Sequence, residues 1–246
     1  MTEKHVLAVL LLDETGSMQS IKQKTISSIN EYVEGLLPHG KQCHLTLVKF
    51  NSAGTNFLCN DVPVKDVPKL TEKNYLPSHN TPLLDAVAKT IKETDEKIRT
   101  SKLKPDVLFI VLTDGEENDS REYNQKQVSD LIITKEKDGW TMVYLGANQD
   151  SWTSAHALGY GNRGTVANFK ATPEGITEVM ATNYAATNRY FHRRTIYGSS
   201  EAGITGAAFA DTNFMAAAPN TAESLDKDIA EFKARLKEKE EKKDGK

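Results

Sequence analysis

The chain has 246 residues, of which 38% are apolar and 26% charged. This apolar content is enough for a folded core and excludes a wholly disordered chain, and the net charge of −3 excludes a global attraction to nucleic acid or anionic membranes. The longest apolar run, residues 6–12, is far shorter than the about 20 residues of a membrane span. Residues 1–5 lead into this run without a cleavage-site pattern, so we expect no signal peptide and a cytoplasmic protein.

The beginning of the chain predicts a buried strand followed by a helix. Residues 6–12 are continuously apolar, as in a strand that is covered on both faces. A helical period begins at Ser17 and ends at Pro38. This order is typical of the first βα unit of a parallel sheet.

A hairpin is predicted next. Residues 44–50 alternate between apolar and polar, turn residues occupy 51–56, and residues 57–64 form the edge partner. In this register Cys43 faces about residue 64 and Cys59 about residue 48. The two thiols are therefore beyond disulfide reach, and we predict that both cysteines are free.

The rest of the main domain continues the alternation. Helices are predicted from Thr81-Pro82, at 122–137, at 153–158 and from 172, and strands at 107–112, 141–145 and 165–169. Strands separated by helices predict an α/β fold. We expect a doubly wound, Rossmann-like, mostly parallel sheet with one antiparallel edge strand and helices on both faces.

The composition changes near residue 195. Residues 1–195 form the predicted main domain, residues 196–220 an Ala/Gly-rich linker or extension, and residues 221–246 a highly charged C-terminal helix. This helix carries a narrow apolar stripe and is marginal alone, so we expect it to dock on the domain or on another copy. Its stripe consists of Leu225, Ile229, Phe232 and Leu236.

Oxygen-bearing side chains gather where buried strands end. Asp13, Thr15 and Ser17 follow the first strand, Thr81 precedes the second helix, and Asp114 follows the second buried strand. The carboxyl ends of parallel strands share one edge of a sheet, where such folds place their sites. Two carboxylates and three hydroxyls form a ligand set for a hard cation such as Mg²⁺.

Each of these residues also has a purely structural interpretation. Ser17 and Thr81 are good helix caps, and Asp114 with Gly115 is a common turn. Asp13 is harder to explain in this way, because a carboxylate that directly follows a buried apolar strand needs a partner. The order and placement of all five residues together favour a metal site.

At these positions the sequence resembles the von Willebrand factor type A family, whose metal-ion-dependent adhesion site has the pattern Asp-x-Ser/Thr-x-Ser, a later Thr and a later Asp. All five positions are filled, with Thr15 where Ser is more usual; the hydroxyl is kept. Residues 144–150 and 169–175 also look like small prokaryotic or phage intracellular members. The matching residues are Asp13, Thr15, Ser17, Thr81 and Asp114.

The resemblance implies a binding module rather than a catalyst. The hydroxyls of Thr15 and Ser17 would bind Mg²⁺ directly, with Mn²⁺ or Ca²⁺ acceptable in vitro, and a partner protein would supply an Asp or Glu to the open position. Asp13→Ala is expected to abolish this binding, whereas Glu14 is expected to point away and to serve as a control.

The sequence is also compatible with two other classes of function. An Asp-based, Mg²⁺-dependent phosphotransferase-like hydrolase also begins with an Asp after an apolar strand, but its usual second acid is replaced here by Thr15. A structural or assembly protein is compatible with the fold. Pro63 and Lys65 discourage pairing at the edge strand, so we expect a monomer, or a weak dimer through the C-terminal helix.

Three other features of the sequence do not predict a function. The Gly-rich segment 159–164 lacks the residues of a nucleotide loop. The basic and aromatic segment 189–194 is read as the solvated end of a core helix, so no nucleic-acid partner is predicted. His79, His156 and His192 are scattered along the chain, and no zinc site is predicted from them.

Overall fold

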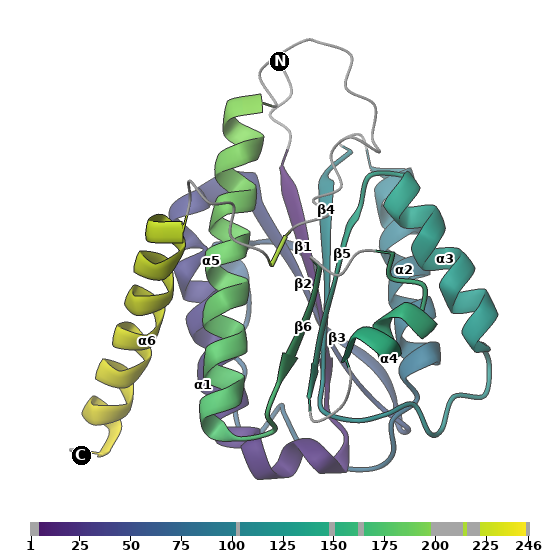
Figure 1. Ribbon diagram of the computed structural model, residues 1–246, viewed down its shortest axis with the longest axis horizontal. Helices are drawn as coiled ribbons and strands as arrows, with labels where there is room; N and C mark the ends of the chain where they lie inside the picture. Colours follow the sequence, from purple (N-terminus) through teal and green to yellow (C-terminus); the bar gives the residue numbers. More distant parts are fainter. Residues whose placement is uncertain are drawn as a thin grey trace.

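The computed structural model describes residues 5–101, 104–147, 151–161, 165–197, 214–215 and 222–244. Within these residues the strands form one six-stranded sheet with the order β3-β2-β1-β4-β5-β6 (Figure 1). The strands are β1 (Val6–Asp13), β2 (Cys43–Asn51), β3 (Gly54–Pro63), β4 (Asp106–Thr113), β5 (Thr141–Ala147) and β6 (Val166–Phe169). Only the pairing of β2 with β3 is antiparallel among the strands described, so the predicted fold class is confirmed.

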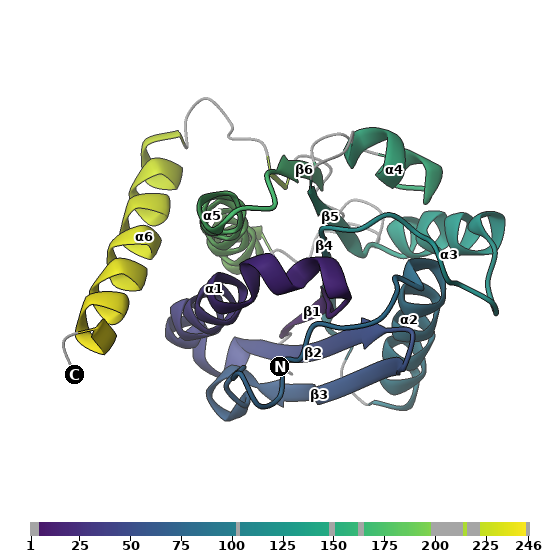
Figure 2. The same ribbon diagram turned by 90° about the horizontal axis from the view of Figure 1, so that it is seen from below.

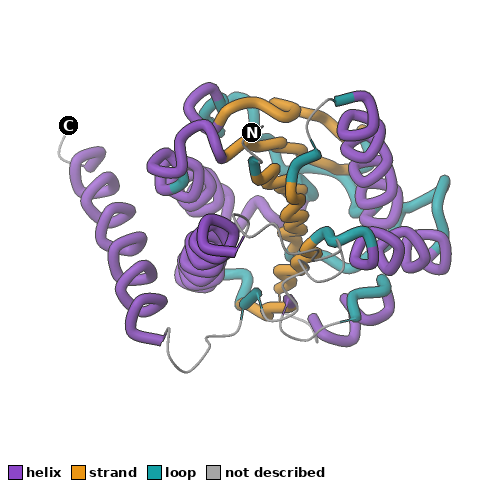
Figure 3. Tube along the Cα trace, turned by 90° about the horizontal axis from the view of Figure 1, so that it is seen from above, coloured by secondary structure: helices purple, strands orange, loops and turns teal. Residues whose placement is uncertain are grey.

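Helices cover both faces of this sheet (Figures 2 and 3). The α-helices are α1 (Lys22–Gly35), α2 (Leu83–Thr100), α3 (Gln125–Lys137), α4 (Ser151–Ala157), α5 (Pro173–Tyr197) and α6 (Ala222–Asp244). Short 3₁₀ helices are η1 (Gly16–Ile21), η2 (Leu37–Gln42) and η3 (Val64–Asp66).

The apolar run of β1 separates two hydrophobic layers. Every residue of this strand is buried, because successive side chains point to opposite faces and both faces are covered. Ala8 and Leu10 pack in the layer that contains residues of α1 and α5, and Leu7 and Val9 in the layer under α2 and α3. The unbroken hydrophobicity of the run therefore follows from its central position in the sheet.

The hairpin contains a bulge that the pattern did not reveal. Pro63 pairs with His44, as the predicted register requires, but Cys59 pairs with Leu47 instead of residue 48. The register shifts between Leu45 and Leu47 and again before Val48. Both cysteines are free, as predicted.

Helix α3 begins three residues later than predicted. Asn124 forms a capping box with Gln127, in which the Asn124 side chain accepts from the Gln127 amide and the Gln127 side chain accepts from the Asn124 amide. This reciprocal pair satisfies two amides at the helix start and fixes the boundary at Gln125.

Helix α6 lies within the predicted C-terminal segment 221–246 and packs against the main domain. It lies beside α1 and α5 (Figures 1 and 2). Phe232 and Leu236 from its stripe are buried, and Phe232 packs at 5.5 Å from the ring of Tyr184. The side chain of Leu225 and most of the predicted linker 196–220 lie outside the described residues; Ile196 and Tyr197 belong to α5.

Ion pairs, which the apolar pattern did not show, explain the attachment of α6. Glu31 of α1 has a fully buried side chain and pairs with both Arg235 and Lys239 of α6. Arg235 also lies over the ring of Tyr184, at 5.1 Å from its centroid. Two cations from one helix thus neutralise a buried carboxylate of another.

A candidate metal centre at the carboxyl edge of the sheet

Three loops meet at the carboxyl ends of β1 and β4. Residues 13–17 leave β1, Thr81 lies just before α2, and Asp114 follows β4. Because β1 and β4 are parallel neighbours whose register aligns Leu12 with Leu112, Asp13 and Asp114 emerge at the same edge. Figure 2 views the molecule from this end.

Four of the five predicted site residues are joined by short contacts. The hydroxyls of Thr15 and Ser17 are 3.1 Å apart, and the Ser17 hydroxyl donates to Oδ1 of Asp114 at 2.5 Å. The amide of Thr15 donates to Oδ1 of Asp13 at 2.7 Å. The alternate side chains of this turn therefore converge.

The hydroxyl of Thr81 lies on the other side of Gly115 from the carboxylate of Asp13. A Cβ atom on Gly115 would lie 3.0 Å from the Thr81 hydroxyl and 3.7 Å from Oδ2 of Asp13. Only glycine leaves this space free between the hydroxyl and the carboxylate. Asn118 holds Thr81 in place, since its side chain accepts from the Thr81 amide and its own amide donates to the Thr81 carbonyl.

The site is closed inward and open outward. Asp13, Thr15 and Thr81 are buried, with exposed fractions of 0%, 1% and 3%. Ser17 is exposed and Asp114 is partly exposed. An ion between these oxygens would be held from below and would keep a face toward the surface.

The helix-cap interpretation of the hydroxyls is wrong. Ser17 lies inside η1, whose cap residue Thr15 makes no side-chain cap bond, and Pro82 rather than Thr81 caps α2. The first amides of α2 are satisfied instead by Glu117 and Ser120. The hydroxyls of Ser17 and Thr81 are therefore not used in helix capping.

Two residues that the sequence reasoning missed position Asp13. The Thr113 hydroxyl donates to Oδ2 of Asp13 at 2.5 Å, and the Tyr75 hydroxyl donates to the Asp13 carbonyl at 2.7 Å. Thr113 could have been found from the register, because the last residue of β4 lies opposite the last residue of β1. Tyr75 lies in a loop that no pattern linked to this edge.

Glu14 points away from the site, but it is a structural residue and cannot serve as a neutral control. It is buried, its Oε1 pairs with Lys49 at 2.7 Å, and the same oxygen accepts from the Leu76 amide. Its removal would leave the ammonium of Lys49 buried without this partner.

The electrostatics of the pair of aspartates favour a counter-charge. Burial raises the pKa of Asp13 to about 6, against the opposing effect of hydrogen bonds from Thr113 and Thr15. Burial also raises the pKa of Asp114, although the Ser17 hydroxyl opposes this. Both carboxylates are therefore less stable as anions than free ones.

The von Willebrand factor type A domain family model matches residues 8–181. The chain belongs to this family. The match begins within β1 and ends within α5, so α6 lies outside it. A comparison with curated proteins found no match.

Solved structures share this VWA fold at low identity. The mussel byssus proximal thread matrix protein 1 with a zinc-occupied MIDAS motif is 14% identical, with a TM-score of 0.55; the match covers 72% of this chain and 46% of that one. The SpRpn10 VWA domain is 10% identical, with a TM-score of 0.54; the match covers 71% of this chain and 93% of that one. The manganese-loaded TRAP protein of Plasmodium vivax is 16% identical, with a TM-score of 0.51; the match covers 74% of this chain and 73% of that one. The chain thus spans under half of the mussel protein.

No helix among the described residues is both long and apolar enough to cross a bilayer.

Proposed function

We propose that Asp13, Thr15, Ser17, Thr81 and Asp114 bind a magnesium ion, and that this ion captures a carboxylate of a partner protein. The observation that carries the proposal is the contact between the exposed Ser17 hydroxyl and the Asp114 carboxylate, within reach of the buried Asp13 and Thr15. This arrangement supports an ion with one face toward the surface.

The donor set fits a hard divalent cation. Two carboxylates balance the charge of the ion, the hydroxyls are neutral oxygen ligands, and nitrogen and sulfur donors are absent from the five residues. Two of the similar solved structures are a manganese-loaded protein and a protein with a zinc-occupied MIDAS motif, which supports a divalent cation here. Mg²⁺ is the proposed ion because it is the plentiful hard dication of the cytoplasm.

Binding, rather than catalysis, is the function that these residues support best. The position two residues after Asp13 holds Thr15, so the second acid that most such phosphotransferases use is missing. A cation with few charged ligands remains electrophilic enough to hold an external Asp or Glu. Metal and partner should then strengthen each other's binding.

We further propose that the protein acts in the cytoplasm of a prokaryote or its phage, as a monomer or weak dimer. Pro63 at the end of β3 cannot donate a ladder hydrogen bond and Lys65 follows it, which discourages edge pairing.

Capture of a partner from native lysate by the immobilised full chain tests this function. We expect a protein that is retained with Mg²⁺, released by EDTA and recaptured when Mg²⁺ is restored. Asp13→Ala should lose it, whereas Glu116→Gln should keep it, because Glu116 is an exposed carboxylate next to the site that is not among the five ligands. Retention that is equal with EDTA, or equal in Asp13→Ala, would contradict the proposal.

A further inference from the structure

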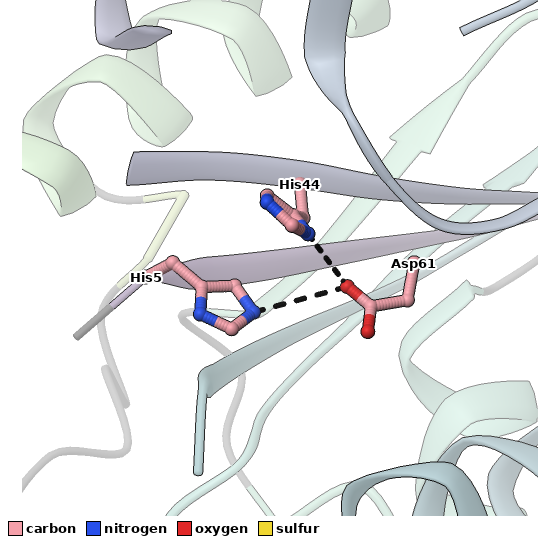
Figure 4. A group of neighbouring side chains, drawn as sticks. All are labelled: His5, His44 and Asp61. Carbon is pink, nitrogen blue, oxygen red and sulfur yellow. Dashed lines mark hydrogen bonds and ion pairs between the residues drawn. The ribbon is translucent and has the colours of Figure 1, made fainter. Parts of the chain in front are cut away.

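A second cluster of metal-ligating side chains lies at the opposite end of the sheet. His5 precedes β1, His44 is the second residue of β2, and Asp61 lies in β3. One ligand atom of each lies within 4.8 Å of the others. Figure 4 shows that both imidazole rings turn a nitrogen toward the same oxygen of Asp61.

The distances are close to those of a metal site. Nδ1 of His44 lies 2.8 Å and Nε2 of His5 lies 3.8 Å from Oδ1 of Asp61. Two ligand atoms of a tetrahedral zinc ion are about 3.3–3.5 Å apart, given zinc–nitrogen and zinc–oxygen bonds near 2.0–2.1 Å. Shifts of about half an ångström in these side chains would bring both pairs to that separation.

A buried nitrogen without a hydrogen bond points to a ligand here. His5 is 8% exposed, and its Nε2 has no hydrogen-bond partner among the described residues. Buried polar atoms are almost always paired. In the simpler interpretation, His44 and Asp61 form a hydrogen-bonded pair and His5 packs on His44 at 4.4 Å between ring centroids. The buried Nε2 of His5 then has only an ion-pair contact of 3.8 Å with Asp61 and no hydrogen bond.

The bulge of the hairpin places Asp61 in this cluster. Asp61 has a positive φ of 55°, a conformation that Asp tolerates better than most residues. Its amide donates to the Thr46 hydroxyl, which in turn donates to the Asn60 side chain. Bulges often redirect a side chain beside a site, and this one is held by Thr46 rather than by the cluster itself.

We propose that His5, His44 and Asp61 form a second, separate metal site that binds Zn²⁺ or a similar transition-metal ion. Two imidazoles and one carboxylate are suitable ligands for zinc, and three protein ligands leave a fourth position for water. The side chains of His44 and Asp61 are 24% and 20% exposed, so the ion has a route from solvent. An ion here would tie the start of β1 to the edge hairpin.

Titration of the untagged, metal-stripped full chain with Co²⁺ tests this site. Tetrahedral Co²⁺ absorbs visible light far more strongly than the octahedral ion expected among the oxygens at the other edge. We expect an intense band that saturates at one equivalent, is displaced by Zn²⁺ and is unaffected by excess Mg²⁺. Absence of the band, together with no calorimetric Zn²⁺ binding, would overturn the proposal.

Matched variants assign the ligands. Asp61→Asn keeps the backbone conformation and should weaken Zn²⁺ binding at least tenfold, as should His5→Gln, whereas His156→Gln, an exposed histidine on α4, should not. Equal Zn²⁺ affinity in Asp61→Asn and the parent would refute the site. Thermal unfolding of each variant in the absence of metal, compared with the parent chain, checks that the variants fold.

The same variants test the magnesium site and the zinc site independently of each other. Asp13→Ala should keep the Co²⁺ band while losing Mg²⁺ binding, and Asp61→Asn should do the reverse. Loss of the intense band in Asp13→Ala would place the transition metal at the carboxyl edge and overturn the second site.

Discussion

At the scale of single residues, the carboxylate of Asp13 is held in an environment that favours its neutral form. Its pKa is raised to about 6, chiefly by burial, from an ordinary value near 4. Between these two values the folded chain binds a proton more readily than the unfolded chain. Lowering the pH through this window therefore stabilises the metal-free fold, and raising it costs stability.

Asp13→Asn is expected to stabilise the metal-free protein at pH 7. We expect a gain of about 1–2 kcal/mol, less than the ~3 kcal/mol that such a pKa shift represents, because the amide keeps only one acceptor oxygen for Thr15 and Thr113. Urea unfolding in EDTA at pH 7 and pH 4.5 measures it. The gain should shrink at the lower pH, and an equal gain at both would show that the charge of Asp13 is not its cause.

Thr113 is expected to act as a positioning residue for the proposed magnesium site. Thr113→Val keeps the shape of the side chain but removes the hydrogen bond to Oδ2 of Asp13, so it should weaken Mg²⁺ binding by about tenfold or more, as is typical for residues that orient metal ligands. Thr113→Ser should restore most of the affinity. Calorimetric titration would show this, and equally weak binding in the serine variant would point to packing instead.

Some residues of the proposed magnesium site could be predicted from the sequence, and others could not. Asp13 and Asp114 could be predicted because a carboxylate at the end of a buried strand needs a partner. Thr113 could be found only through the register of β4 against β1, and Tyr75 could not be predicted, because a tyrosine in a loop is common without any site. His5, His44 and Asp61 become neighbours only through the strand register and a bulge, so the sequence predicted no such cluster.

At the scale of elements, the attachment of α6 depends on few groups. Phe232 is fully buried, and Phe232→Ala should destabilise the protein by about 3 kcal/mol. Lys237→Ala, an exposed position on the same helix with an i,i+4 pair to Glu241, should change stability by less than about 0.5 kcal/mol. Chemical denaturation measures both. A small effect of Phe232→Ala would show that α6 is loosely docked in solution.

The strands were predicted better than the helix ends. Apolar runs such as residues 6–12 and 107–112 predict central strands, since only central strands are buried on both faces. The start of α3 depended on one reciprocal cap, and the packing of α6 on a buried Glu31 whose partners lie over 200 residues away in sequence. Long-range ion pairs leave no local pattern.

At the scale of the whole molecule, the C-terminal helix packs on the domain through α1 and α5. The five proposed magnesium ligands lie in loops after β1, before α2 and after β4, and none of them belongs to α6. Deleting residues 221–246 would remove the buried side chains of Phe232 and Leu236 and both cationic partners of Glu31, so we expect a lower melting temperature. We expect the affinity for Mg²⁺ to be unchanged where the truncated chain is folded, as measured by calorimetry well below its melting point. A folded truncation with weaker Mg²⁺ binding would show that α6 shapes the carboxyl edge.

The most direct test of the central claim is calorimetric titration of the metal-free full chain with Mg²⁺ and Mn²⁺. We expect one ion per chain with modest affinity, because two carboxylates and three hydroxyls form an incomplete shell. Binding should be lost in Asp13→Ala and in Asp114→Asn and retained in Glu116→Gln and Asp61→Asn. Absence of binding in the parent chain, or binding in Asp13→Ala equal to that of the parent, would contradict the account.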